Sequence, residues 1–153
     1  MKKFRYSMES ILNIKLKLED QAKLAYANAR SRLIAEEEKL EAMKRKKASY
    51  EQQQRSQSNN KLNIMKMKQL SEAIEIMKMN IKQQVVVVKT AEQRLEIARI
   101  RLNEAMIERK THERLKENAW HEYLMDVTAE EQKDIDELNS FKHNGLLLHE
   151  EDR

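Results

Sequence analysis

The chain of 153 residues contains no cysteine, no proline and a single glycine. Without cysteine it can form neither a disulfide nor a thiolate metal site. Turns are built mainly from Gly, Pro, Asn, Asp and Ser, so a chain this poor in the first two can reverse direction only a few times. Aromatic residues are also scarce, at 5%. These shortages argue against an ordinary globular domain, although the length would suffice for one.

Long hydrophobic runs are absent as well. The longest is Val85–Val88, far short of the ~18 apolar residues that a membrane-spanning helix needs. The first residues are basic, but no apolar stretch of signal-peptide length follows them. We therefore expect a soluble, cytosolic protein.

What the chain does have is charge combined with periodic apolar residues. Charged residues make up 37% and apolar residues 40%, and the apolar ones recur at helical spacing. This combination is typical of long helices and coiled coils. Disorder is the alternative that the high charge suggests, and the periodicity disfavours it. The predicted fold is all-α: an elongated antiparallel two-helix coiled coil, or helical hairpin, with a short helical segment at its tip.

The first arm is predicted over about residues 8–54. The four-residue step from Ala29 to Leu33 interrupts its stripe and predicts a stutter, which locally relaxes the supercoil. The turn-like run Ser56–Asn60 predicts the reversal of the chain. The stripe of this arm is Met8, Ile11, Leu18, Ala22, Ala25, Ala29, Leu33, Leu40, Met43 and Tyr50.

The second arm is predicted over residues 91–141, where neither Gly nor Pro interrupts the chain. Its opening stretch, about 93–138, is expected to pair with residues 8–52. Residues 56–90 are then left to form the turn and a tip helix. Gly145 is expected to end the last helix, so that residues 142–153 form a frayed tail.

The tip helix has its own apolar stripe, Leu70, Ile74, Met77 and Ile81. This stripe either packs on the ends of the arms or stays open for a partner protein, because Met-rich helical faces suit adaptable binding. Trp120 in the second arm leaves a similar choice, between packing inside the hairpin and docking a partner. Val85–Val88 is expected within a helix or at a kink.

The charges favour a hairpin over a parallel dimer. The first seventeen residues are basic, whereas ten acidic residues from Glu122 onward face only Lys133, Lys142 and Arg153. In a hairpin the basic start lies beside the acidic end, and their attraction favours the antiparallel arrangement. A generic coiled coil that self-associates as a parallel dimer or bundle is the alternative.

No motif for chemistry stands out, so no enzyme, metal or cofactor is predicted. His121-Glu122 could open a zinc-protease motif, but Met125 stands where the second histidine is required. The basic cluster Lys44–Lys47 runs into Gln, Ser and Asn instead of leucine heptads, which disfavours nucleic-acid binding. A small-molecule substrate is not expected, because a two-helix rod has no pocket.

Several short segments, taken in order, resemble the family of the bacterial flagellar export protein FliJ. The injectisome counterparts of that family share the same layout. The segments are Phe4-Arg5-Tyr6 leading into Met8–Lys17, then Ala35–Leu40 and Tyr50, then Lys68–Leu70 through to Ile74, and finally Glu131–Glu137.

This resemblance implies an antiparallel coiled coil similar to the rotor stalk subunit of rotary ATPases. Family members insert their paired termini into the hexameric export ATPase and contact the cytoplasmic domain of the membrane export gate. Some also escort empty export chaperones. The resemblance therefore implies a protein that is monomeric on its own and sits at the inner face of the cell membrane, at the flagellar base.

The resemblance also implies two sets of contact residues. In the gate-contacting stripe the family often has aromatic residues around the Leu70 position, where this chain is aliphatic and Met-rich. The implied gate-binding residues are Met43, Tyr50, Leu70, Ile74, Met77 and Ile81. The implied ATPase-binding residues are Lys2, Lys3 and Arg5 at the start, with Glu131, Lys133, Asp134 and Glu137 near the end.

Overall fold

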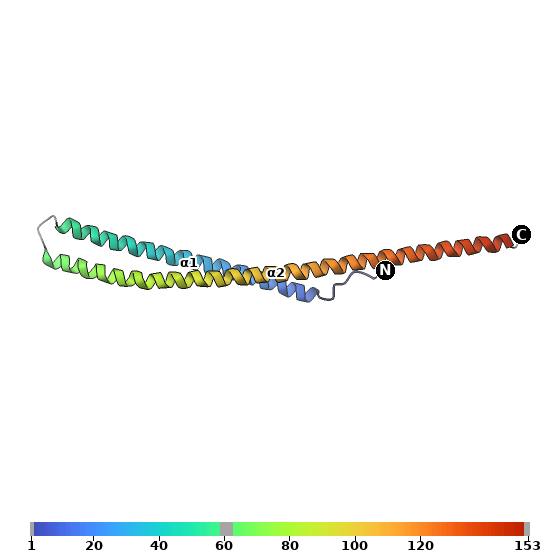
Figure 1. The fold of residues 1–153 in the computed structure, drawn as a ribbon, viewed down its shortest axis with the longest axis horizontal. Helices are drawn as coiled ribbons and strands as arrows, with labels where there is room; N and C mark the ends of the chain where they lie inside the picture. Colours follow the sequence, from blue (N-terminus) through green and yellow to red (C-terminus); the bar gives the residue numbers. More distant parts are fainter. Residues whose placement is uncertain (1, 59–62, 152–153) are drawn as a thin grey trace. The chain divides into compact units, whose positions relative to one another are not determined.

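The computed structural model describes residues 2–58 and 63–151. These residues form two α-helices and no strand: α1, Glu9–Ser58, and α2, Ile64–Glu151 (Figure 1). The chain reverses between them, close to the predicted turn, of which Asn59 and Asn60 lie outside the described residues. In the described part of the chain, no helix combines the length and apolar character needed to cross a membrane.

The contacts divide the chain into two compact units. One, the terminal unit, is Met1–Lys17 with Ile107–Arg153, and the other, the hairpin unit, is Leu18–Met106. In the hairpin unit, Glu36 meets Gln84 and Gln54 meets Ser71, so the residue number rises along α1 as it falls along α2. The contacts of the terminal unit run in the same sense, as described below. This antiparallel pairing confirms the predicted all-α hairpin.

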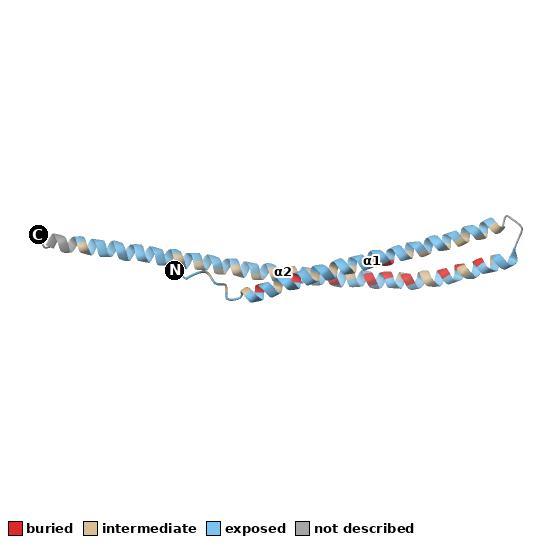
Figure 2. Ribbon diagram, turned by 180° about the vertical axis from the view of Figure 1, so that it is seen from behind, coloured by how far each residue is buried: buried red, intermediate tan, exposed pale blue. Residues whose placement is uncertain are grey.

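Within the hairpin unit, the least exposed residues of both helices recur at alternating steps of three and four. That is an unbroken heptad, and the buried residues lie where α1 and α2 face each other (Figure 2). On α1 these seam residues are Glu19, Ala22, Tyr26, Ala29, Leu33, Glu36, Leu40, Met43, Lys47, Tyr50 and Gln54. On α2 they are Met67, Leu70, Ile74, Met77, Ile81, Gln84, Val88, Ala91, Leu95, Ala98 and Leu102.

The predicted stutter after Ala29 is therefore wrong. The step from Ala29 to Leu33 is one of the regular four-residue steps of the heptad. The predicted stripe took Leu18 and Ala25 as seam residues, but both are exposed, and Tyr26 lies in the seam instead. The heptad register is hard to recognise in the sequence because a charged residue, Glu36, occupies a seam position where an apolar residue is expected. Only 3% of its surface is exposed.

The predicted tip helix over residues 56–90 and a second arm beginning at Ala91 are also wrong. Helix α2 runs without a break from Ile64 onward. The predicted pairing placed Glu36 opposite residue 110, whereas the structure places it opposite Gln84. Pairing directly after the turn closes a shorter loop, and it buries the apolar stripe that begins at Leu70.

Two further expectations concern the helical state of single segments. Val85–Val88 lies inside α2, where Val88 is a buried seam residue. Gly145 does not end the helix, because α2 continues to Glu151 and no described glycine has a positive φ. Glycine permits the left-handed conformation of a helix stop without enforcing it, so the predicted frayed tail from residue 142 is not found up to Glu151.

Candidate partner-binding surfaces

The six residues implied to contact an export gate all lie in the seam of the hairpin unit. Leu70, Ile74 and Met77 are buried, at 8%, 7% and 8% exposure, and Met43, Tyr50 and Ile81 are half-buried. The structure brings them together as the core between α1 and α2, so the stripe packs inside the chain. Their contact with a gate stays a prediction.

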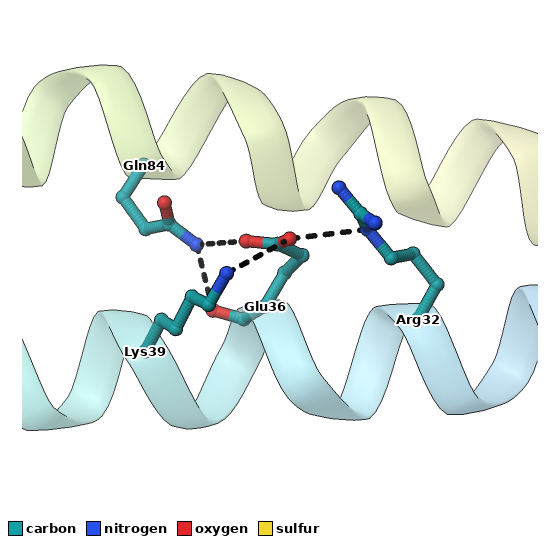
Figure 3. A network of polar contacts seen from close by, with 4 residues as sticks. All are labelled: Arg32, Glu36, Lys39 and Gln84. Atoms are coloured by element: carbon teal, nitrogen blue, oxygen red, sulfur yellow. Dashed lines mark hydrogen bonds and ion pairs between the residues drawn. The ribbon is translucent and has the colours of Figure 1, made fainter.

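A polar layer interrupts this apolar seam at Glu36 and Gln84 (Figure 3). The Gln84 amide donates from Nε2 to the Glu36 carboxylate at 2.6 Å and to the Glu36 backbone oxygen at 2.9 Å. Arg32 Nε and Lys39 Nζ lie 3.1 and 3.6 Å from the other carboxylate oxygen. The Gln84 hydrogen bond, followed by these two cations, holds the pKa of Glu36 below its ordinary value.

Sequence reasoning missed this layer, because a glutamate among Glu36–Glu38 looks like part of a solvated face. The signal was its place in the heptad, three residues after Leu33 and four before Leu40. A carboxylate kept ionised and saturated with donors acts as a structural pair rather than as a general base. Among the residues described, no group of three or more His, Cys, Asp or Glu side chains could hold a metal ion.

In the terminal unit, the segment before α1 is held on α2 by an aromatic cluster, the aromatic clasp. The ring centroid of Phe4 lies 5.0 Å from that of Trp120, edge to face, and 5.4 Å from that of Tyr123. The Trp120 and Tyr123 rings stack at 5.5 Å, and the Tyr123 hydroxyl donates to the Lys2 carbonyl at 2.6 Å. Trp120 therefore packs on the segment that precedes α1, although it remains 41% exposed.

The clasp can be tested through Trp120, the only tryptophan of the chain. Phe4→Ala removes the edge-to-face partner of Trp120. This change should weaken binding of the segment before α1 to α2 by about 1 kcal/mol. We expect a red-shifted tryptophan emission and stronger quenching by iodide. Phe141→Ala is the matched control, because Phe141 is 79% exposed and belongs to no ring pair of the described chain. Unchanged emission in Phe4→Ala would contradict the clasp.

Two ion pairs also join α1 and α2 in the terminal unit. Lys116 pairs with Glu9 at 2.8 Å and Lys15 with Glu108 at 2.5 Å, again with opposite chain directions. The hydrogen bond and charge of Lys15 hold the pKa of Glu108 below its ordinary value. Such partly exposed pairs contribute at most about 1 kcal/mol each. Among the described residues of this unit, Leu12, at 4% exposure, is the one buried apolar residue, so we expect this unit to open more readily than the hairpin unit.

The terminal unit also contains the residues implied to bind the ATPase. Lys2, Lys3 and Arg5 precede α1, and Glu131, Lys133, Asp134 and Glu137 lie on α2; all are exposed. The backbone oxygen of Lys2 accepts a hydrogen bond from Tyr123, which lies eight residues before Glu131 on α2. No hydrogen bond or ion pair among the described residues joins the basic group to the acidic one.

Toward its C-terminal end, α2 is amphipathic and has an uncovered apolar side. We call this side the free α2 face. Every residue from 128 to 144 is exposed. Leu124, Ile135, Leu138 and Leu146 are 40%, 52%, 56% and 66% exposed, and their spacing places them on one side of the helix. The opposite side is acidic, with Asp126, Glu130 and Glu137 at helical spacing. Glu131 and Lys142 fall on the same side as the apolar residues by their spacing. No described residue covers this side, which is therefore available to a partner.

Comparison with known proteins identifies the family. The model of the family described as "Flagellar FliJ protein" matches residues 4–145. The chain belongs to the FliJ family. Among solved structures, CT670 of Chlamydia trachomatis, described as a candidate YscO homologue, is similar with a TM-score of 0.65 and 21% identity, over 99% of this chain and 100% of that one. That likeness shows a shared fold. No curated protein sequence matches the chain.

Membership of the FliJ family confirms the resemblance of the sequence segments and associates the chain with flagellar type III export. The matched residues include the aromatic clasp and almost the whole free α2 face. In this FliJ-family chain, the stripe that the resemblance assigned to the gate forms the hairpin core. The uncovered surface lies instead at the end of α2.

Proposed function

We propose that this FliJ-family chain is a non-enzymatic stalk and adaptor of the flagellar export apparatus, which couples the hexameric export ATPase to the cytoplasmic domain of the export gate. The observation that carries the proposal is the free α2 face. An amphipathic helix with an uncovered apolar side can bury that side in a groove of a partner, and an ATPase ring is the partner proposed for it.

The two sides of this segment have different roles in the proposal. Ile135 and Leu138 supply apolar area that is buried on docking. Asp134 and Glu137 steer the segment toward a basic surface and set its orientation, whereas Glu131, four residues before Ile135, lies on the apolar side and pairs with a cation of the partner. The basic start, Lys2, Lys3 and Arg5, is held near Tyr123 by the clasp and contacts acidic positions of the same ring.

The hairpin unit is the proposed gate-binding part. Because Leu70, Ile74 and Met77 are buried, a gate contact uses their edges or the neighbouring exposed residues unless the helices separate locally. The protein then acts at the cytoplasmic side of the membrane, at the flagellar base. There it is also placed to meet export chaperones.

The alternative, a coiled coil that associates with itself, would cover the free α2 face with a second copy. Asp126, Glu130, Glu131, Asp134, Asp136 and Glu137 fall within this segment, with Lys133 as its only cation between residues 126 and 137. Two such segments side by side repel each other, which favours a basic partner over a second copy.

The test is stimulation of the purified export ATPase. Added protein is expected to raise both the hydrolysis rate and the hexamer fraction several-fold, and Ile135→Asp/Leu138→Asp is expected to abolish the effect. Both side chains are exposed, so the variant should keep its helicity. The matched control, Ile76→Asp/Met79→Asp, changes exposed residues of the hairpin unit and should stimulate normally.

Two results would count against the proposal. Full stimulation by Ile135→Asp/Leu138→Asp would remove the free α2 face from the ATPase contact. No stimulation by the unmodified protein would remove the ATPase from its partners.

A further inference from the structure

A groove lies along one side of the hairpin unit, between α1 and α2. Its volume is about 570 Å³, and Ala22, Ala25, Ala29 and Ala98 line it. A second hollow of about 230 Å³, beside Ala91 and Val87, shares the lining residue Arg94 with the first. We call the two together the alanine groove.

Alanine is the cause of the groove. Ala22, Ala29, Ala91 and Ala98 are seam residues, and each fills its position with one methyl group. Nearer the turn, the corresponding seam positions carry Leu70, Ile74 and Met77, which fill the space between the helices. Where the seam side chains are this small, they leave a hollow between the two helices on one side of the seam.

The rim of the groove is apolar and exposed. Leu18 and Ile97 line the larger hollow at 44% and 49% exposure, and Val87 lines the smaller one at 39%. The other flank of the α2 seam carries charged residues instead. Lys82 and Lys89 directly follow seam residues, whereas the groove residues Arg94 and Arg101 directly precede them. The groove flank therefore combines exposed apolar side chains with two arginines, whereas the other flank carries two lysines at the same spacing.

The groove also carries unneutralised positive charge. Arg94 and Arg101 line it, both are exposed, and neither has a hydrogen bond or ion pair with a described residue. No acidic side chain lines the larger hollow. Glu36 lines the smaller hollow, but its carboxylate is already bound by Gln84, Arg32 and Lys39.

We propose that the alanine groove binds an acidic amphipathic α-helix of a partner protein, which completes a three-helix bundle. Small and aliphatic residues of that helix fill the hollow, and two of its carboxylates pair with Arg94 and Arg101. These arginines are two helical turns apart, roughly 10 Å, so carboxylates seven residues apart on the incoming helix match them.

This occupant fits better than two others. A second copy that used the same groove would bring the arginines of the two copies together. A nucleic acid would neutralise the arginines but would leave Leu18, Ile97 and Val87 uncovered. The proposal concerns the hairpin unit alone and does not depend on ATPase binding by the end of α2.

The test uses two labelled synthetic helical peptides, with Leu and Ala on the buried side and either Glu or Lys at the flanking positions. Fluorescence anisotropy is expected to show saturable, salt-sensitive binding of the Glu peptide and at least about tenfold weaker binding of the Lys peptide. Arg94→Glu/Arg101→Glu should reverse this preference. Ala25→Phe fills the hollow without a change in charge and should weaken the binding of both peptides.

The matched control is Lys82→Glu/Lys89→Glu, which makes the same change of charge at the same spacing on the other flank. It should bind the Glu peptide as the unmodified protein does, and circular dichroism should show that all variants are folded. Equal binding of both peptides, or equal loss in the control variant, would overturn the proposal. Self-association that Arg94→Glu/Arg101→Glu abolishes would identify a second copy as the occupant and would also overturn it.

Discussion

Replacing Ile74 by alanine is expected to lower the free energy of unfolding of the hairpin by about 2 kcal/mol. The same replacement at Ile76 is expected to cost less than about 0.5 kcal/mol. Ile74 is 7% exposed in the seam and Ile76 is 59% exposed, so only the first leaves a cavity between α1 and α2. Urea unfolding followed by far-ultraviolet circular dichroism measures both.

The pair is matched because both positions are isoleucine, two residues apart on α2, and both changes alter helix propensity equally. The value for Ile74 lies at the low end of the usual range, since a seam between two helices has fewer neighbours than a globular core. Equal costs at the two positions would contradict the register described above.

This result decides how binding data on the implied gate residues should be interpreted. Alanine at Leu70 or Ile74 would weaken gate binding through unfolding even if neither side chain touched the gate. Met77→Leu conserves volume and keeps the seam packed, so it separates the two effects. Lost gate affinity in a fully folded Met77→Leu protein would indicate direct contact.

The second large effect is expected from removal of the polar layer. Glu36→Leu/Gln84→Leu should raise the midpoint of thermal unfolding by about 5 °C, because buried polar pairs are often less stabilising than leucine in the same space. The same variant should form dimers or larger species, whereas the unmodified chain should sediment as a monomer. A buried carboxylate with one matching amide donor selects a register and a partner, because every other pairing leaves the carboxylate without that hydrogen bond.

Analytical ultracentrifugation measures this change over a range of concentrations. Glu41→Leu/Gln83→Leu is the control, since it introduces the same side chains at two exposed neighbouring positions. Gln84→Leu alone should destabilise the hairpin, because it removes the 2.6 Å hydrogen bond to the Glu36 carboxylate. A strictly monomeric double variant would show that apolar packing alone selects the register.

Part of the candidate sites could be predicted from sequence. Leu70, Ile74, Met77 and Ile81 were recognised as one stripe because their spacing is local information. Which surface covers them depends on the register of α1, and Glu36 in the seam concealed that register. The alanine groove was not predictable from the same pattern, since an alanine at helical spacing indicates a seam as readily as a hollow beside one.

The sequence by itself determined that this chain is almost wholly helical and reverses its direction near residue 60. The reason is local, because a chain with no proline, one glycine and periodic apolar residues has few other ways to satisfy its backbone. Only the tertiary structure decided which residues of α1 meet which residues of α2. Contacts such as Glu36 with Gln84 join residues 48 apart, and their energy is absent from any local pattern. That pairing buried the stripe assigned to the gate and left the end of α2 uncovered.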